Sequence, residues 1–303
     1  MTKNKFITGV ATLLLGFLFS CDNTTADPIN NNLNNPNNPN NPSGGGGGGT
    51  PTISGPRILH KVTVNNVTNQ EYFTTGTTLE KAVFKEASGP SSFLIGRVTY
   101  TSGKIYRVKF EQEVNGSVPA NSLSYEYNLT YDSSGKINYT TCTTMAGSIP
   151  SFNSEYTYTY DGSGKMTKIV EKKKAGTTYT HFTNYTLTNS GDNITKVAIE
   201  NGMTSPTGVP DMSTVYMSTS YNFDGYDTKI NPYTTLPKAF FITWSLLHPA
   251  NFCSLSANNV MTFNIINPAP IPAIPGAYTY LYDSQNYPVS DQSQMQKYLY
   301  KAL

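Results

Sequence analysis

The sequence predicts an all-β protein, an antiparallel β-meander of repeated hairpins curled into a barrel or trough, with a short helical insertion near residues 236–248. Three observations predict this fold. Charged residues make up only 13% of the 303-residue chain, and Thr, Ser, Asn and Tyr are abundant, which favours strands and turns over solvated helices. Aromatic and polar residues alternate along many short segments. One Gly-containing turn pattern also recurs at nearly constant spacing.

The N-terminus has the features of a secretory signal. Lys3 and Lys5 precede an apolar stretch over residues 6–19. That stretch is too short to span a bilayer comfortably, so we expect residues 1–20 to be a signal peptide that is removed.

The predicted signal ends in a motif that resembles the lipobox of bacterial lipoproteins. The motif reads Leu18-Phe19-Ser20-Cys21, in which Phe19 departs from the small or β-branched residue preferred at that position. We expect Cys21 to become the first residue of the mature chain and to carry the lipid anchor, diacylglycerol plus an N-acyl chain, because several acyl chains hold a protein stably on a membrane. An ordinary signal peptide followed by a coincidental Cys is the alternative.

The charge balance narrows the range of partners. The whole chain has 21 Lys and Arg against 19 Asp and Glu, a formal net charge of +2. Without Lys3 and Lys5, 19 basic residues face 19 acidic ones and the remainder is neutral. We therefore expect no nucleic-acid partner, and little electrostatic attraction to an anionic lipid surface.

Residues 21–56 are predicted to be a disordered tether. The segment is rich in Asn and Pro and includes six consecutive Gly at positions 44–49, with no apolar periodicity to offset the entropy of ordering it. Flexible-chain scaling gives it a typical reach of roughly 30 to 35 Å. The remaining residues, 57–303, are predicted to form a single β-meander domain.

The predicted location is the bacterial cell envelope, with the protein anchored by lipid in the outer membrane. Asp22, directly after Cys21, would mean retention in the inner membrane by resemblance to the enterobacterial sorting rule. The Asn- and Gly-rich tether instead favours the outer membrane. The periplasmic and the surface leaflet both stay open.

One hairpin pattern recurs from residue 94 onward. In one copy, Tyr131-Asp132-Ser133-Ser134-Gly135-Lys136 predicts a type I turn, with the Asp side chain bonded to its own backbone and Gly in the left-handed conformation. Asp132, Asp161 and Asn189 follow one another at intervals of 29 and 28 residues, about one hairpin each. The six copies lie at residues 98–105, 129–137, 158–166, 185–194, 221–230 and 278–287.

Each predicted hairpin has a single apolar, Tyr-rich face. Before the second turn, Tyr125, Tyr127 and Tyr131 alternate with polar residues, and after the first turn Tyr106 and Phe110 do the same. Each buried Tyr removes on the order of 150 Å² of surface from water, so an open flat sheet with this face exposed is unfavourable. The sheet is therefore predicted to curl or to be covered.

Two segments can cover the sheet. Residues 236–248 have apolar residues at helical spacing and predict a short helix that packs in the core or acts as a lid; these residues are Leu236, Phe240, Trp244 and Leu247. Residues 267–275 contain four prolines and predict an extended loop rather than a central strand. The C-terminal residues 295–300 fit a helix and a strand equally well. A disulfide between Cys142 and Cys253 and two free thiols are both open.

The Tyr-x-Tyr-Asp-x-x-Gly-Lys motif resembles the YD repeat of large bacterial surface and toxin-encapsulating proteins. More closely, the chain resembles a family of bacterial envelope lipoproteins of unknown function, with YD-repeat-like hairpins and a fold likened to a porin-type barrel. The resemblance covers residues 94 to 290 and includes a short helical insertion that ends in a Leu-Ser-x-Asn-Asn stretch, here Leu255 to Asn259. It implies an architecture and no particular activity.

The sequence contains no recognisable catalytic or metal-binding motif. His60, His181 and His248 lie far apart, and none has a second His or a Cys at metal-ligand spacing. The recurring acidic residues of the repeats fit turn formation better than calcium binding; these are Asp132, Asp161, Asp224 and Asp283. No pair of glycosidase carboxylates stands out among Glu111, Glu113, Glu126 and Glu155. We therefore predict no catalytic, cofactor-binding or metal-binding residues, and Cys21 is the one predicted functional position.

The leading hypothesis is a non-enzymatic envelope lipoprotein that serves as a binding or structural scaffold and takes an apolar or lipid-like ligand on its Tyr-lined concave face. The alternative is a glycan-binding accessory lipoprotein of an outer-membrane uptake system, which needs an exposed aromatic platform. A hydrolase, and a transmembrane β-barrel with lipid-facing strands, are further alternatives.

Overall fold

The computed structural model describes residues 53, 55–89 and 91–303. The predicted signal segment, the predicted anchor residue Cys21 and most of the predicted tether lie outside the described residues.

Strands are the dominant secondary structure of the described chain, as predicted. Its first nine strands are β1 (Arg57–Val64), β2 (Val67–Thr75), β3 (Thr78–Lys85), β4 (Ser92–Thr101), β5 (Lys104–Val114), β6 (Leu123–Tyr131), β7 (Ile137–Ala146), β8 (Ile149–Tyr160) and β9 (Met166–Ala175). The others are β10 (Thr178–Ser190), β11 (Asn193–Thr204), β12 (Pro210–Asp211), β13 (Met217–Tyr226), β14 (Val260–Ile266), β15 (Ile274–Ala277), β16 (Leu281–Tyr282), β17 (Pro288–Ser290) and β18 (Gln296–Ala302). The helical elements are the 3₁₀ turns η1 (Met212–Thr214), η2 (Pro232–Thr235) and η3 (Pro249–Leu255) and the α-helix α2 (Lys238–Leu247).

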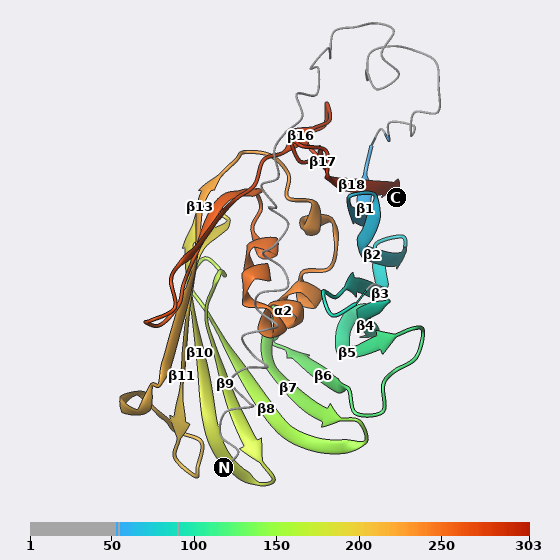
Figure 1. Cartoon of the computed structure of the whole chain (residues 1–303). Coiled ribbons are helices and arrows are strands. Elements are labelled where there is room, and N and C mark those ends of the chain that lie inside the picture. Colours follow the sequence, from blue (N-terminus) through green and yellow to red (C-terminus); the bar gives the residue numbers. More distant parts are fainter. Residues whose placement is uncertain (1–52, 54, 90) are drawn as a thin grey trace, which may run out of the picture.

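All 18 strands belong to one antiparallel sheet. From one edge to the other the main strands follow the order β15, β14, β13, β11, β10 and so on down to β1, and then β18, β17 and β16. The sheet curls around the helical insertion without closing, so the trough is confirmed and the closed barrel is not formed (Figure 1). Between β15 and β16 the chain crosses from one sheet edge to the other, where the Tyr280 hydroxyl donates to Val260 O at 3.2 Å.

The predicted turn chemistry is present in the second and third repeats. The Asp132 carboxylate accepts hydrogen bonds from the backbone N–H groups of Ser134 and Lys136, at 2.9 and 3.0 Å. Gly135 has a φ of +83°, the left-handed conformation that L-residues with a Cβ adopt at a cost. Asp161 forms the same bonds in the next hairpin. We call the end of the trough that carries these turns the turn rim.

A bulge follows each of these turns, which the alternation pattern did not predict. Tyr131 pairs with Ile137 and Thr130 pairs with Tyr139, so Asn138 is left as the extra residue. In the first repeat the extra residue is Tyr106, which therefore does not continue the apolar face of β5, contrary to the prediction. The extra residue of a bulge shifts the inward and outward alternation of the side chains by one position. It also increases the local twist of the strand, which helps the sheet to curl.

The Tyr before each turn connects neighbouring hairpins. The Tyr131 hydroxyl donates to Ile105 O at 2.6 Å, and the Tyr160 hydroxyl donates to Ile137 O at 2.8 Å. Each acceptor is the apolar residue that follows the turn of the preceding hairpin. The repeated Tyr and apolar positions of the motif thus form a ladder along the turn rim, because each hairpin is bonded to the one before it.

The fifth repeat is not a hairpin of its own, contrary to the prediction. Asp224 lies within β13 instead of a turn, and β13 pairs with β14 only after the helical insertion over residues 231–259. The carboxylate at the end of this strand is Asp227, which accepts a hydrogen bond from Lys229 N at 2.9 Å.

The helical insertion packs inside the trough. The predicted helix is confirmed, with Pro237 as its N-cap and His248 as its C-cap. Phe84 stacks on Trp244 with ring centroids 4.0 Å apart, and Phe110 lies 5.7 Å from Phe240. The insertion therefore completes the core, as predicted. No helix in the part of the chain described by the structure is both long and apolar enough to cross a membrane.

The two ends of the folded chain meet. The C-terminal segment is a strand, and β18 pairs with β1 over their whole lengths, from Arg57 opposite Ala302 to Val64 opposite Gln296. The proline-rich segment is a loop followed by β15, a short strand at the sheet edge where Pro275 is tolerated. In the part of the chain that the structure describes, all strands and the whole core lie within residues 57–302, so a fragment that begins at residue 53 includes all of them.

Candidate functional site

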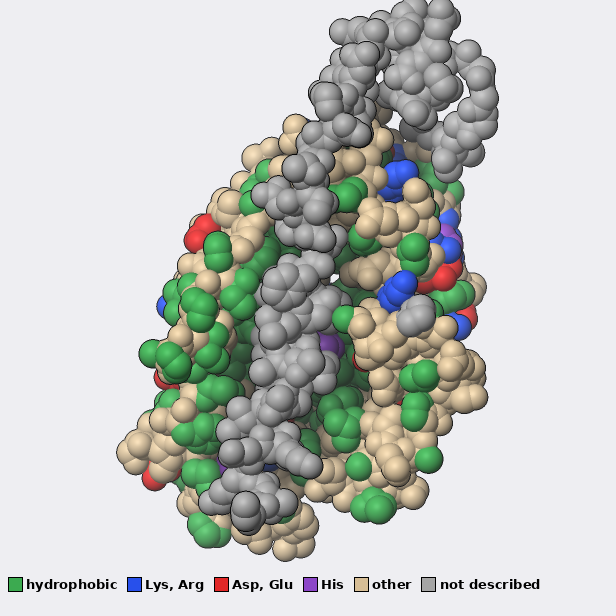
Figure 2. Space-filling model, viewed as in Figure 1, with side chains coloured by type: hydrophobic (Ala, Val, Ile, Leu, Met, Phe, Trp, Pro, Cys, Tyr) green, Lys and Arg blue, Asp and Glu red, His purple; other side chains and the backbone are tan. Residues whose placement is uncertain are grey.

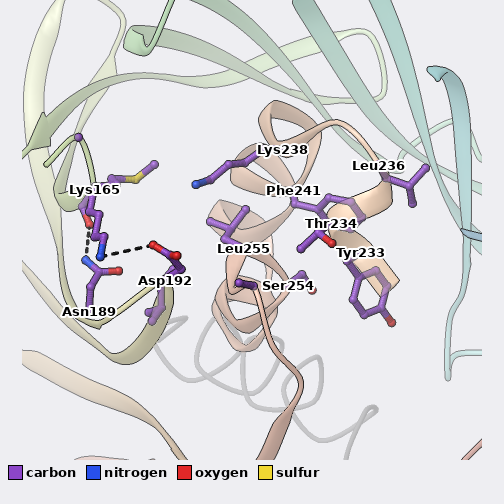
Figure 3. Close-up of a pocket in the computed structure, with 14 residues that line it drawn as sticks. Lys165, Asn189, Asp192, Tyr233, Thr234, Leu236, Lys238, Phe241, Ser254 and Leu255 are labelled. Atoms are coloured by element: carbon purple, nitrogen blue, oxygen red, sulfur yellow. Dashed lines mark hydrogen bonds and ion pairs between the residues drawn. The ribbon is translucent and has the colours of Figure 1, made fainter. Parts of the chain in front are cut away.

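A cavity of about 350 Å³ lies between two turns of the turn rim and the helical insertion (Figure 3). One wall comes from the β8–β9 and β10–β11 turns, and the other comes from η2, α2 and η3. The lining residues are Gly164, Lys165, Met166, Asn189, Asp192, Ile194, Tyr233, Thr234, Leu236, Lys238, Phe241, Ser254, Leu255 and Ala257. Its volume is within the range of small-molecule sites in proteins.

Hydrogen bonds connect the helical insertion to the β10–β11 turn and so fix the two walls of the cavity relative to each other. The Ser256 hydroxyl is fully buried and accepts from Ile194 N at 3.0 Å. The Asn231 amide donates to Cys253 O and to Ser256 O. Asn258 N donates to Asn193 Oδ1 at 3.0 Å. The Leu255-to-Asn259 stretch is thus a structural clasp between the insertion and the β10–β11 turn.

Most of the cavity wall is apolar. The side chains of Met166 and Ile194 come from the sheet, and those of Leu236, Phe241 and Leu255 come from the insertion. An apolar body placed among them would leave water, which stabilises binding in proportion to the area buried.

The polar part of the cavity carries more positive than negative charge. Lys165 Nζ donates to Gly191 O and lies 3.5 Å from Asp192 Oδ1, so these two ionic groups compensate each other. Lys238 extends from α2 toward that pair (Figure 3) and makes no hydrogen bond or ion pair with any described residue. Two cations and one carboxylate therefore line the cavity, and Lys238 is the cation without a close counter-ion.

The environment of Lys238 disfavours an uncompensated charge. Partial burial lowers the pKa of its ammonium group, and the nearby Asp192 carboxylate opposes this shift. More than a third of Lys238 is nonetheless exposed, so water still solvates the ammonium group. A carboxylate or phosphate bound beside Lys238 would supply the missing counter-ion.

The three histidines do not converge on this cavity or on one another. His60 lies in β1, His181 lies in β10 and His248 follows α2. Burial lowers the pKa of His248 to about 4, and its ring lies 4.4 Å from that of Trp244. Among the residues that the structure describes, no group of three His, Cys, Asp or Glu side chains could hold a metal ion.

The four candidate carboxylates of the sequence lie outside this cavity. Glu111 pairs with Lys109 at 2.6 Å on the face of β5 opposite to the core, and Glu155 pairs with Lys174 on β9. Glu113 stands two residues after Glu111 on the same face of β5, and Glu126 lies opposite Lys109 on β6, diagonal to Glu111. None of the four lines the cavity.

The sequence analysis missed the most deeply buried carboxylate, Glu171. It is 4% exposed and accepts hydrogen bonds from the Ser154 and Tyr156 hydroxyls at 2.7 and 2.9 Å. Nearby, burial and the charge of Glu171 raise the pKa of the Cys142 thiol to about 12. The signal was available, because Glu171 stands two residues after the buried Ile169, on the inward side of β9. Both hydroxyls bond to Oε1 of Glu171, and Lys173 Nζ lies 3.6 Å from the same oxygen.

The positions of the two cysteines and of the tryptophan do not favour a reactive or a sugar-binding site. Cys142 and Cys253 are free thiols. Trp244 is only 4% exposed, so it is not available to stack on a sugar, and a glycan platform would have to be built from Tyr side chains alone.

Comparison with known proteins gives a likeness of fold. No protein-family model matches the chain, so its resemblance to the envelope lipoprotein family stays a prediction. No curated protein matches it either. Among solved structures, it is similar to a porin-like protein from Bacteroides vulgatus ATCC 8482, with 12% identity and a TM-score of 0.45 over 81% of this chain and 100% of that one. A porin-like protein from Bacteroides uniformis ATCC 8492 is similar over 80% of this chain and 96% of its own, with 14% identity and a TM-score of 0.43.

Proposed function

We propose that this protein is a lipid-anchored binding protein of the bacterial cell envelope, and that its cavity takes an amphiphile with an acidic group and an apolar body. The observation that carries the proposal is the position of Lys238, a cation without a counter-ion among the described residues, beside the apolar wall formed by Leu236, Phe241 and Leu255. A long-chain carboxylic acid or a lipid phosphate has both matching parts.

The binding site in this proposal is the cavity rather than the whole Tyr-lined face. Several of the inward-facing tyrosines are core residues, since Tyr127, Tyr156 and Tyr185 are at most 5% exposed. The helical insertion lies over this face and Phe252 packs on Tyr185, with ring centroids 6.0 Å apart. The space beside Lys238 is therefore the better candidate for a ligand.

Binding is proposed instead of catalysis because none of the candidate carboxylates and histidines lines the cavity, and because the buried carboxylate Glu171 is engaged by the Ser154 and Tyr156 hydroxyls. Anchoring at Cys21 and location in the outer membrane are part of the proposal and rest on the sequence. Incorporation of a labelled fatty acid into the chain, lost in Cys21→Ser, tests the anchor.

Titration of the fragment 53–303 with a long-chain carboxylic acid and with the neutral alcohol of equal chain length tests the cavity. We expect the acid to bind more tightly than the alcohol. Lys238→Met should weaken acid binding at least tenfold, roughly the contribution of one charge-assisted contact, and leave alcohol binding nearly unchanged.

The matched control is Lys196→Met, which removes an exposed Lys of β11 that does not line the cavity. It should bind both compounds as the parent fragment does. Equal affinity of acid and alcohol for the parent fragment, or an equal loss in both Lys variants, would refute the role assigned to Lys238.

A further inference from the structure

The end of the trough opposite to the turn rim has a different surface. It carries the β1–β2, β3–β4, β5–β6, β7–β8, β9–β10, β11–β13, β14–β15 and β17–β18 connections, and we call it the loop rim. In Figure 1, β9 and β11 point toward it. Apolar side chains at the tips of its connections are exposed: Val118, Ile149, Val209, Met212, Tyr216 and Ile271.

The turn rim has no comparable feature. Within its turns at residues 102–103, 132–136, 161–165 and 191–192, which the structure describes in full, no large apolar side chain is exposed. The two rims therefore differ in chemistry although the same strands end at both. Figure 2 shows separate hydrophobic side chains over most of this face of the molecule, some of them at its lower end.

The loop rim is also poor in charged residues. Its connections at residues 65–66, 86–91, 115–122, 147–148, 176–177, 205–216, 267–273 and 291–295 contain three charged residues, Glu86, Asp211 and Asp291. Transfer of a charged side chain out of water is costly, whereas transfer of an exposed apolar side chain is favourable. These connections can therefore enter an apolar environment without a large desolvation penalty.

We propose that the loop rim inserts its apolar tips into the interfacial layer of a lipid bilayer. Successive connections at this rim lie two strands apart, roughly 10 Å, so the tips are separated by polar backbone and side chains. A protein partner needs a continuous complementary surface, which spaced tips do not offer. The interfacial layer of a fluid bilayer can adapt to separate apolar side chains, so that each of them can insert individually.

The sequence length before the sheet is compatible with this arrangement. The sheet begins at Arg57, at the turn rim, whereas the predicted anchor is Cys21. The 36 residues between them span at most about 120 Å, and the longest strands span roughly 40 Å. The predicted anchor and the loop rim can therefore reach the same bilayer.

Co-sedimentation of the fragment 53–303 with phosphatidylcholine vesicles tests the proposal, because this fragment lacks Cys21 and any attached lipid. We expect the fragment to partition onto vesicles, with little change between roughly 0.1 and 1 M salt, since these connections contain only three charged residues and phosphatidylcholine has no net charge. The triple variant Ile149→Ser, Val209→Ser and Ile271→Ser should reduce partitioning at least tenfold.

The matched control is the triple variant Leu281→Ser, Leu299→Ser and Leu303→Ser, which removes exposed apolar side chains away from the loop rim. It should partition as the parent does. The three rim residues are 69, 63 and 55% exposed, so both variants should retain the parent's circular dichroism spectrum and unfolding midpoint.

Two results would overturn the proposal. One is no vesicle binding by the parent fragment, whether or not it self-associates through the loop rim. The other is an equal loss of binding in the rim and control variants.

Discussion

Asp161 and Gly164 have separate roles within one turn of the repeat. The Ser163 hydroxyl and the N–H groups of Lys165 and Ser163 bond to the Asp161 carboxylate and hold its pKa below the usual value. Gly164 has a φ of +85°, and Lys136 Nζ from the preceding hairpin lies 2.8 Å from the place where a Cβ would stand. Gly is therefore favoured at position 164 for two reasons: the positive φ, and the lack of a Cβ next to the Lys136 side chain.

We predict that Gly164→Ala destabilises the domain by about 1 to 2 kcal/mol, because Ala is strained in the left-handed conformation and displaces the Lys136 side chain. Gly162→Ala in the same turn is the control, since Gly162 has no positive φ and no atom within 4 Å of the added Cβ. Urea unfolding followed by the fluorescence of the single Trp measures both. Equal stability of the two variants would contradict the assigned role of Gly164.

The turn residues were predictable from the sequence because their bonds are local. Asp132 and Gly135 act within five residues of each other, and their pattern is sufficient to identify them. Lys238 was not predictable as a site residue. It is an ordinary Lys at the start of a helix until the fold places the 164–166 and 189–194 segments opposite to it.

At the scale of the elements, the helical insertion is fixed by a few buried polar groups. Ser256 accepts the N–H of Ile194, and Tyr226 donates to Ile194 O while its hydroxyl lies 3.1 Å from Ser256 Oγ. By contrast, the Ser245 hydroxyl in α2 is equally buried but has no hydrogen-bond partner among the described residues. Two buried serines of one insertion therefore differ in their contribution to stability.

We predict that Ser256→Ala lowers the free energy of unfolding by roughly 1 to 3 kcal/mol, because Ile194 N–H remains buried without an acceptor. Ser245→Ala should be neutral or stabilising, since it removes an unsatisfied hydroxyl. Both values come from denaturant unfolding of the fragment 53–303. A larger loss in Ser245→Ala than in Ser256→Ala would show that the clasp does not hold the insertion.

The elements that the sequence misassigned depend on distant parts of the chain. The stretch from Tyr221 to Tyr226 has the local pattern of a turn, yet β13 runs through it because its partner β14 comes only after the insertion. The bulge at Tyr106 has no signal in a period-2 pattern, since one extra residue changes the phase without changing composition. Helix 236–248 was predictable because its spacing is regular over three turns.

At the scale of the whole molecule, the core contains many phenol groups. Burial raises the pKa of Tyr72, Tyr127, Tyr156, Tyr185 and Tyr298 well above the usual value of 10.0. Below pH 10 these groups are protonated in both the folded and the unfolded chain, so they give no pH dependence. Above pH 10 the unfolded chain loses protons that the folded chain retains, and the stability falls as pH rises.

We predict that the domain unfolds between about pH 10 and 12, since each such Tyr lowers the free energy of unfolding by about 1.4 kcal/mol per pH unit above 10. Spectrophotometric titration of phenolate together with circular dichroism should show one cooperative transition. In Tyr185→Phe, the free energy of unfolding should decrease less steeply with pH above 10, by the contribution of one Tyr, about 1.4 kcal/mol per pH unit. A domain whose stability is unchanged up to pH 12 would contradict this account.

The apolar, Tyr-rich face predicted that the sheet curls. It did not predict that the first and the last strand of the described chain pair with each other. Periodicity in residues 57–64 and 296–302 identifies candidate strands and says nothing about which distant strand each one joins. The pairing of β1 with β18 is therefore a property of the whole chain.

That pairing has a consequence for biosynthesis. The ribosome makes the first strand of the sheet at the start of the domain and the neighbour that completes it at the very end. Contacts between such distant segments form slowly, because the long intervening loop must close first. A nascent chain that extends only as far as β17 therefore still lacks the strand that pairs with β1, and it cannot reach the final topology of the sheet before β18 is made.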